Sequence, residues 1–270
     1  MKAIVNKQIC ALHTQPTRES SLTDEVLYGM VVELLDMPVP GWYRVRTHYR
    51  YEGFASAQDL LVENAEVWEQ QQKHMVLHKN QCDVLSAPKV QGYLMQTLPR
   101  GGLVISEGEA ADGWQKVRLA DGRVGFVPAS IMVPQPLSPV SAQEAALRER
   151  LVETALLYQG THYRWGGKSP QGIDCSGLCS MAYMLCGILI YRDADIREGF
   201  PIRQIPVEEM APGDLIFFPG HVAMYIGNHR YCHSTGKHGS NGFAINSLDP
   251  TAPDYREDLH ESITQVGSYF

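Results

Sequence analysis

The chain lacks both an excess of positive charge and long apolar runs. Its 270 residues include 23 Lys and Arg against 30 Asp and Glu, a formal net charge of −7. Nucleic-acid binding usually requires a basic face, so we expect no nucleic-acid partner, and an acidic chain is equally unsuited to an anionic membrane surface. No apolar stretch reaches the roughly 18 residues that a membrane-spanning helix needs, so we expect no membrane partner.

Cysteine is scarce, and no two cysteines form a CxxC pair. Six Cys in 270 residues are too few for a disulfide scaffold, and their spacing does not fit a zinc finger or ribbon. We therefore expect reduced thiols, no metal ion and no other cofactor. Residues 1–7 carry charge but not the apolar core of a signal peptide. This favours a cytoplasmic protein, while the loss of an export signal from the sequence stays open.

The character of the sequence changes near residue 136. Before it, short β-branched and aromatic runs alternate with Gly, Pro, Asp and Asn; after it, helix and strand patterns are mixed. Three prolines fall within residues 134–139. Because proline disfavours helix and removes a backbone donor, this segment is predicted to be a stiff, extended linker.

The first half contains an internal repeat. Residues 41–46 and 113–118 share the pattern Gly-Trp-x-x-Val-Arg at an offset of 72 residues, and residues 52–57 are similar to 124–129 at the same offset. Apolar and polar residues alternate with period two in these runs, which predicts strands. Each copy is therefore expected to be a small β unit.

The repeated motif resembles that of bacterial SH3-like domains. The resemblance implies one SH3-like β-barrel at residues 1–66 and a second at 75–134, followed by a third domain at 140–270. Phe54 stands where Trp is usual in this motif, a mild change for packing.

The second half opens with a predicted helix. Ser141 and Glu144 have the spacing of a capping box, and apolar residues follow at near-helical spacing. Gly160 is placed to end this helix. Its expected role is packing alone.

The residues around Cys175 predict a reactive thiol. Cys175 precedes a run of apolar and small residues that is typical of a helix, so it should stand in the first turn. Unpaired N–H groups and the helix dipole at that position lower a thiol pKa and favour the nucleophilic thiolate. Cys179 and Cys186, further along the same helix, are expected to be small buried side chains.

A nucleophilic thiol needs a base, and two histidines are candidates. His221 begins one strand-like run, and His233 lies in the next. A hairpin that turns at residues 227–229 would place both on one face of a sheet, near enough to hydrogen-bond. One imidazole would then act as the base while the other fixes its tautomer.

Taken together, these segments resemble the NlpC-type cysteine peptidases. The ordered set is Asp-Cys-Ser-Gly at 174–177, Gly-Asp-Leu at 213–215, the run 221–227, and His233. The resemblance implies an α+β protein in which a papain-like catalytic core, with a helix packed on an antiparallel sheet, follows two small SH3-like β-barrels. It also implies hydrolysis of peptidoglycan peptides.

Carried over to this sequence, the resemblance makes Cys175 the nucleophile, His221 the general base and His233 the polar third member. The tandem SH3-like domains are similar to those of one branch, the γ-D-glutamyl-L-diamino acid endopeptidases, which cleave after D-glutamate in stem peptides with a free N-terminal L-alanine. The expected partner is thus a peptidoglycan-derived peptide, L-Ala-γ-D-Glu-diamino acid, and the expected role is murein peptide recycling in the cytoplasm.

The same resemblance implies five substrate-binding residues: Asp174, Ser176, Tyr51, Asp193 and Glu19. Asp174 and Ser176 flank the nucleophile and are expected to help recognise the L-alanine amine. Tyr51 is the best match for a tyrosine of the first SH3-like domain, and Glu19 is the candidate for an acidic partner. Ala194 stands where some members carry Ser, so one hydroxyl contact to substrate is expected to be missing.

Two other functions stay open at this stage. One is a secreted peptidoglycan hydrolase whose SH3-like domains bind the cell wall. The other is a metal-binding module that uses Cys175, His221, Cys232 and His233. The sequence leaves the diamino acid, diaminopimelate or L-lysine, undecided.

Overall fold

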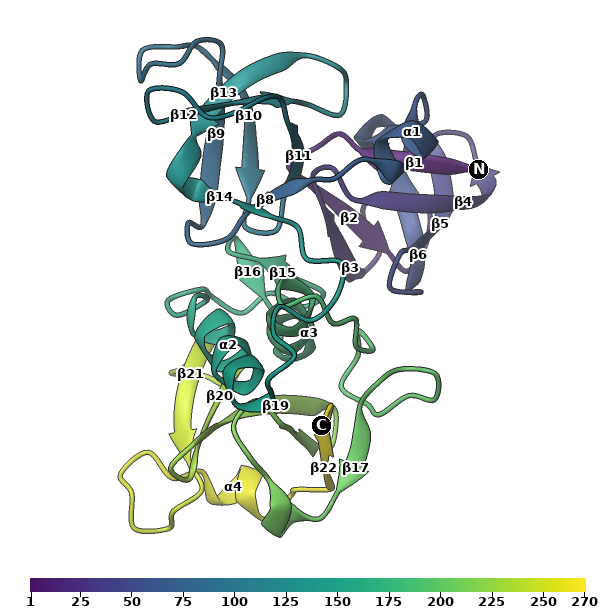
Figure 1. Cartoon of the computed structure of the whole chain (residues 1–270). Helices are drawn as coiled ribbons and strands as arrows, with labels where there is room; N and C mark the ends of the chain where they lie inside the picture. Colours follow the sequence, from purple (N-terminus) through teal and green to yellow (C-terminus); the bar gives the residue numbers. More distant parts are fainter. The chain divides into compact units, whose positions relative to one another are not determined.

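The structure is a computed structural model that describes all of residues 1–270 (Figure 1). It divides into two compact units, Met1–Gln135 and Pro136–Phe270, and the division falls inside the proline-rich segment. The finer boundaries at 1–66, 75–134 and 140–270 stay a prediction. None of the helices combines the length and the apolar character needed to cross a membrane.

The first unit is built from two seven-stranded sheets with the same topology. The strand order is β3-β2-β6-β5-β4-β1-β7 in one and β10-β9-β13-β12-β11-β8-β14 in the other. Adding seven to each strand number of the first sheet gives the order of the second, so the two sheets have equivalent strands in equivalent positions. This equivalence confirms the internal repeat, and the SH3-like identity of the two sheets stays a prediction.

The first sheet consists of β1 (Lys2–Val5), β2 (Ile9–His13), β3 (Leu22–Leu27), β4 (Val31–Val39), β5 (Trp42–Thr47), β6 (Glu52–Ser56) and β7 (Leu60–Leu61). A 3-10 turn, η1 (Ala57–Asp59), and a short helix, α1 (Ala65–Gln70), complete this part. The second sheet consists of β8 (His74–Val76), β9 (Gln81–Leu85), β10 (Leu94–Pro99), β11 (Leu103–Ser106), β12 (Trp114–Arg118), β13 (Val124–Pro128) and β14 (Met132–Pro134), with the 3-10 turn η2 (Ala129–Ile131).

One glycine in each repeat shows why the repeated motif needs that residue. A Cβ on Gly53 would lie 2.9 Å from the Cβ of Leu12, and a Cβ on Gly125 would lie 2.5 Å from Cγ1 of Val84. In each sheet a neighbouring strand therefore approaches the backbone too closely for any side chain.

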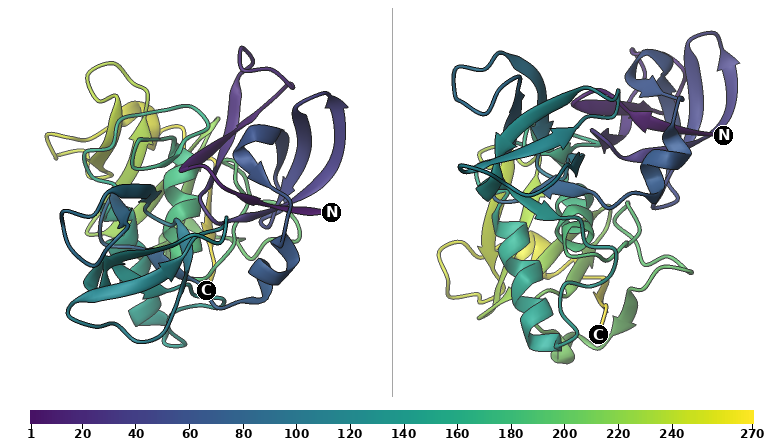
Figure 2. Two further views of the ribbon diagram at one scale, coloured as in Figure 1. Left: turned by 90° about the horizontal axis from the view of Figure 1, so that it is seen from above. Right: turned by 45° about the horizontal axis from the view of Figure 1, so that its top comes forward.

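The second unit is a six-stranded antiparallel sheet with two helices packed on it. The strand order is β17-β22-β18-β19-β20-β21, and α3 packs against α2, β19 and β20 (Figure 1 and Figure 2). This α+β arrangement is the one predicted for the C-terminal domain. The elements are α2 (Glu144–Leu156), β15 (Lys168–Ser169), β16 (Gly172–Ile173), α3 (Cys175–Leu185), β17 (Arg203–Ile205), η3 (Val207–Glu209), β18 (Leu215–Phe218), β19 (His221–Gly227), β20 (Arg230–Thr235), β21 (Gly242–Ser247), α4 (Glu257–His260) and β22 (Gln265–Ser268).

The predicted capping box of the first helix is wrong. α2 has Gln143 as its N-cap without a side-chain capping bond, because the hydroxyl of Ser141 accepts from the backbone N–H of Gln143 at 3.1 Å instead. The regular helix also ends at Leu156, and turns lead from there to Gly160, which has φ +85°.

The predicted hairpin between the two histidine strands is confirmed. β19 ends at Gly227 and β20 begins at Arg230, and the two residues between them, Asn228 and His229, have φ of 53° and 56°. Both values are positive, as a type I′ two-residue turn requires.

Candidate active site

The start of α3 holds Cys175 in place. Asp174 is the N-cap, and its carboxylate accepts a hydrogen bond from the backbone N–H of Gly177 at 2.6 Å. A Cβ on Gly177 would lie only 2.2 Å from the carbonyl oxygen of Gly167, so the preceding loop approaches this helix where no side chain fits. The first-turn position predicted for Cys175 is thereby confirmed.

Asp174 is the centre of a buried charge network. Its two carboxylate oxygens accept from Nη1 and Nη2 of Arg192 at 3.0 and 3.1 Å, and from the backbone N–H of Gly166 at 2.8 Å. The hydroxyl of Ser176 donates to the same carboxylate at 3.3 Å and accepts from Arg192 at 2.8 Å. With the N–H of Gly177, five donors approach one carboxylate, so Asp174 serves first to order the nucleophile loop. Its predicted contact with a substrate amine stays a prediction.

The thiol of Cys175 is buried, with 7% of the residue exposed. Burial raises the pKa of this thiol to about 11, and the charge of Asp174 acts in the same direction. Hydrogen bonds to the sulfur from the backbone N–H groups of Val222 and Ser176 oppose this shift only in part. The expectation of a resting thiolate is therefore wrong, because desolvation outweighs the helix N-terminus. The Val222 contact also brings the sulfur next to the residue that follows His221.

The two predicted histidines lie together. Nε2 of His221 is 2.7 Å from Nδ1 of His233, and the rings meet nearly edge-on at 76°. His233 is fully buried, whereas His221 is partly exposed. The structure thus confirms the predicted hydrogen bond between these side chains.

Burial keeps both imidazoles neutral. It lowers the pKa of His221 to about 3, and the charge of His233 adds to the effect. It lowers the pKa of His233 to about 4 in spite of an opposing hydrogen bond to Asn246. The thiol of Cys175 and both imidazoles are therefore neutral near pH 7, and His221 keeps one ring nitrogen able to accept a proton.

Asn246 is a member of this chain of hydrogen bonds that the sequence did not indicate. Its Oδ1 lies 3.0 Å from Nε2 of His233, and its Nδ2 donates to the backbone carbonyl of Asp254 at 2.8 Å. Asparagine in a short strand has no distinctive pattern, so only the pairing of β20 with β21 reveals this contact.

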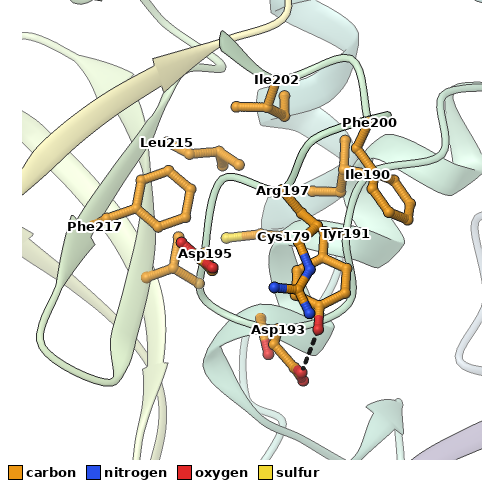
Figure 3. Close-up of a pocket in the computed structure, with 12 residues that line it drawn as sticks. Cys179, Ile190, Tyr191, Asp193, Asp195, Arg197, Phe200, Ile202, Leu215 and Phe217 are labelled. Atoms are coloured by element: carbon orange, nitrogen blue, oxygen red, sulfur yellow. Dashed lines mark hydrogen bonds between the residues drawn. The ribbon is translucent and has the colours of Figure 1, made fainter. Parts of the chain in front are cut away.

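A pocket open to solvent lies beside Ser176, the residue that follows Cys175 (Figure 3). Ser176 and Val222, whose backbone N–H groups reach the Cys175 sulfur, both line it. Apolar side chains, among them Ile202 and Phe217, form part of its wall. This location makes it the candidate binding site for the part of a substrate next to the reacting bond.

The charged side chains of this pocket come from the loop after α3. Asp193, which was predicted to bind substrate, lines it together with Asp195 and Arg197. Tyr191 donates from its hydroxyl to Asp193 at 3.2 Å, and the guanidinium of Arg197 lies 5.0 Å from the centre of the Tyr191 ring (Figure 3). Sequence analysis did not assign Asp195 and Arg197 to the site.

The other two predicted substrate-binding residues lie in the first unit. The hydroxyl of Tyr51 is 3.0 Å from Oγ1 of Thr23, and Glu19 is exposed and accepts from the hydroxyl of Thr17. Their roles stay predictions.

The structure gives no support to the metal-binding alternative. No group of three or more His, Cys, Asp and Glu side chains is arranged to hold a metal ion. All six cysteines are free and buried, and Cys232 follows Tyr231 and precedes His233 on β20, so its side chain points to the opposite face of the sheet from that histidine.

Comparisons with known proteins identify the family. A model described as the NlpC/P60 family matches residues 160–256. A Lysinibacillus sphaericus protein named dipeptidyl-peptidase 6 is 44% identical over 275 residues, which cover 100% of both chains. A Bacillus subtilis protein named gamma-D-glutamyl-L-lysine dipeptidyl-peptidase is 33% identical over 133 residues, which cover 45% of this chain and 42% of that protein.

A solved structure also covers the whole chain. The crystal structure of an NlpC/P60 family protein from Bacillus cereus matches 100% of this chain and 99% of its own, with a TM-score of 0.80 and 21% sequence identity. At this identity the likeness shows the fold alone.

Proposed function

The chain belongs to the NlpC/P60 family and is a cysteine peptidase, and on this premise we propose that it hydrolyses the γ-D-glutamyl–diamino acid bond of peptidoglycan stem peptides whose N-terminal L-alanine is free. In this proposal Cys175 is the nucleophile, His221 the general base and His233 the residue that orients it.

The reaction begins at a neutral thiol. Because Nε2 of His221 is engaged by His233 at 2.7 Å, the thiol proton of Cys175 passes to Nδ1 of His221 as the sulfur attacks the γ-carbonyl carbon. The oxyanion that forms is stabilised by backbone N–H groups at the start of α3. When the C–N bond breaks, His221 returns the proton to the leaving amine, and a thioester remains on Cys175. Water then attacks the thioester, gives its proton to His221 and releases the dipeptide acid, and the thiol is restored.

The charge pattern of the pocket beside Cys175 is the observation that favours this substrate. A dipeptide of L-alanine and γ-linked D-glutamate carries one ammonium group and, because the linkage uses the side chain, one free α-carboxylate. The pocket offers two carboxylates, Asp193 and Asp195, and one guanidinium, Arg197. We assign the ammonium to the aspartates and the α-carboxylate to Arg197, a pairing that charge-assisted hydrogen bonds make specific.

The names of the relatives support the same bond. A dipeptidyl-peptidase and a gamma-D-glutamyl-L-lysine dipeptidyl-peptidase are similar to this chain. A dipeptidyl-peptidase releases an N-terminal dipeptide, which agrees with a pocket that offers carboxylates for a free amine.

The test compares one peptide with its blocked form. L-Ala-γ-D-Glu-diaminopimelate and its N-acetylated form are incubated with the protein, and the L-lysine peptide is a parallel substrate that identifies the diamino acid. Cleavage of the free-amine peptide with little cleavage of the acetylated one is expected, since the acetylated peptide has no ammonium to pair with Asp193 and Asp195. Equal cleavage of both would overturn the proposal.

Two cysteine variants assign the nucleophile. Cys175→Ala is expected to abolish turnover. Cys186→Ala is the matched control, because Cys186 is a buried free cysteine at the end of the same helix and is not part of the pocket lining, and it is expected to keep activity. Full activity of Cys175→Ala would refute the assignment.

We also propose that the enzyme acts in cytoplasmic recycling of murein peptides. A requirement for a free L-alanine amine excludes the intact sacculus, in which that amine is amidated. The alternative, a secreted hydrolase whose first unit binds the wall, predicts release of soluble fragments from intact sacculi. Absence of such release, together with cleavage of free peptides, would favour recycling.

A further inference from the structure

The buried partner of His233 determines which ring nitrogen of each histidine carries a proton. Asn246 lies on β21, where Ala244 pairs with His233, so Asn246 is two residues along and faces the same side of the sheet. We propose that Asn246 is a positioning residue of the peptidase: its amide holds His233, and through it His221, in the Nε2–H tautomer, which leaves Nδ1 of His221 to take the thiol proton.

The first step is the orientation of the amide. Nδ2 of Asn246 is 2.8 Å from the backbone carbonyl oxygen of Asp254, and a carbonyl can only accept. A flipped amide would bring two acceptor oxygens together, so the NH₂ group must face Asp254. Oδ1 of Asn246 therefore faces Nε2 of His233, at 3.0 Å, and it too can only accept.

The second step passes this constraint along the pair. Nε2 of His233 has to donate to Asn246, so Nε2 carries the proton and, in a neutral ring, Nδ1 is a lone pair. Nε2 of His221 lies 2.7 Å from that lone pair and has to donate in turn. The one nitrogen of His221 left without a proton is Nδ1.

The neutral state on which this depends follows from the surroundings. The pair is buried beside the rings of Phe218 and Tyr231, and the cation of Arg256 disfavours a further positive charge on either imidazole. Asp258, which pairs with Arg256, opposes this effect at His233. The pKa values of both rings lie well below 6.5 as a result.

The experiment reads the tautomers directly. Protein labelled with ¹⁵N-histidine is examined at pH 7 by long-range ¹H–¹⁵N correlation, which distinguishes Nδ1–H from Nε2–H rings, and His221→Gln and His233→Gln assign the signals. In the unaltered protein both rings are expected as Nε2–H. Asn246→Leu removes the acceptor at similar size, and here His233 is expected to populate Nδ1–H, with kcat lower by roughly 10- to 100-fold and KM little changed.

Two further variants separate positioning from simple structural damage. Asn246→Asp keeps an acceptor for His233 but turns a second oxygen toward the carbonyl of Asp254, so it should keep the Nε2 proton of His233 while lowering stability. Ser247→Ala removes hydrogen bonds to the backbone of His229 and Asp249 from the same strand without touching the pair, and it should leave tautomers and kcat unchanged. Circular dichroism confirms that each variant is folded.

Some results would overturn the proposal. One is an Nδ1–H signal for either ring in the unaltered protein, and another is a folded Asn246→Leu variant whose tautomers stay Nε2–H. The tautomer readout needs no substrate, so it stands or fails separately from the peptide proposed above.

Discussion

Arg192→Met removes the cation that neutralises Asp174 beside the nucleophile. The guanidinium has 1% of its side-chain surface exposed and the carboxylate 10%, and the two groups form a bidentate pair at 3.0 and 3.1 Å. Methionine fills a similar volume but leaves a buried carboxylate held by neutral donors alone. Breaking a buried pair in this way costs about 3–5 kcal/mol. The free energy needed to open α3 locally should therefore fall by that amount.

Native-state hydrogen exchange of the α3 amides measures this cost. The double variant Arg192→Met/Asp174→Asn removes both charges and keeps a helix cap, because asparagine also caps helices. It should recover at least about 1 kcal/mol of the free energy of α3 opening that Arg192→Met loses. Arg230→Met is the matched control, since its pair with Asp254 is 41% and 30% exposed, and it should cost about 1 kcal/mol or less. A loss below about 1 kcal/mol for Arg192→Met would refute the account of the buried network. So would a double variant that loses as much free energy of α3 opening as the two single variants together.

Three further outcomes follow from the same geometry. In the unfolded chain a histidine binds a proton below pH 6.5, whereas the folded protein keeps His221 and His233 neutral, with pKa values of about 3 and 4. The free energy of unfolding should therefore fall by about 2 kcal/mol per ring between pH 7 and pH 5. Denaturant titration of His221→Gln should show about half of the combined loss, and a profile that does not change with pH would contradict the buried neutral pair. Arg197→Met should lower kcat/KM for L-Ala-γ-D-Glu peptides by about 10- to 100-fold, the value of one charged hydrogen bond, and steady-state kinetics with no change would exclude the carboxylate assignment. Gly177→Ala should cost about 1–3 kcal/mol, because its Cβ would lie 2.2 Å from the Gly167 carbonyl oxygen, and an unchanged thermal midpoint would show that the loop is free to move.

The sequence was sufficient where a short pattern determines local geometry. The spacing of Cys175 before an apolar run placed it at a helix start, and the turn at Asn228 and His229 brought His221 and His233 into contact. The 72-residue offset correctly indicated two sheets of one topology. The family resemblance extended these local patterns to a papain-like core, which the comparisons bear out.

The sequence was insufficient where burial and long-range pairing decide. The thiol pKa depends on how completely Cys175 is desolvated, and the helix position alone pointed in the wrong direction. Asn246 enters the site through strand pairing 13 residues from His233, and Arg192 meets Asp174 across 18 residues. The helix start at Ser141 failed for a local reason, because its hydroxyl forms a turn before the helix instead of capping it.

The most direct test of the central claim is to isolate the acyl-enzyme. The protein is mixed with L-Ala-γ-D-Glu-diaminopimelate, quenched in acid during turnover and digested, and the modified peptide is sequenced by mass spectrometry. A thioester that joins the γ-carbonyl of L-Ala-D-Glu to Cys175 is predicted. An adduct on another residue, one linked through the α-carboxyl, or turnover without any adduct in Cys175 peptides would contradict it.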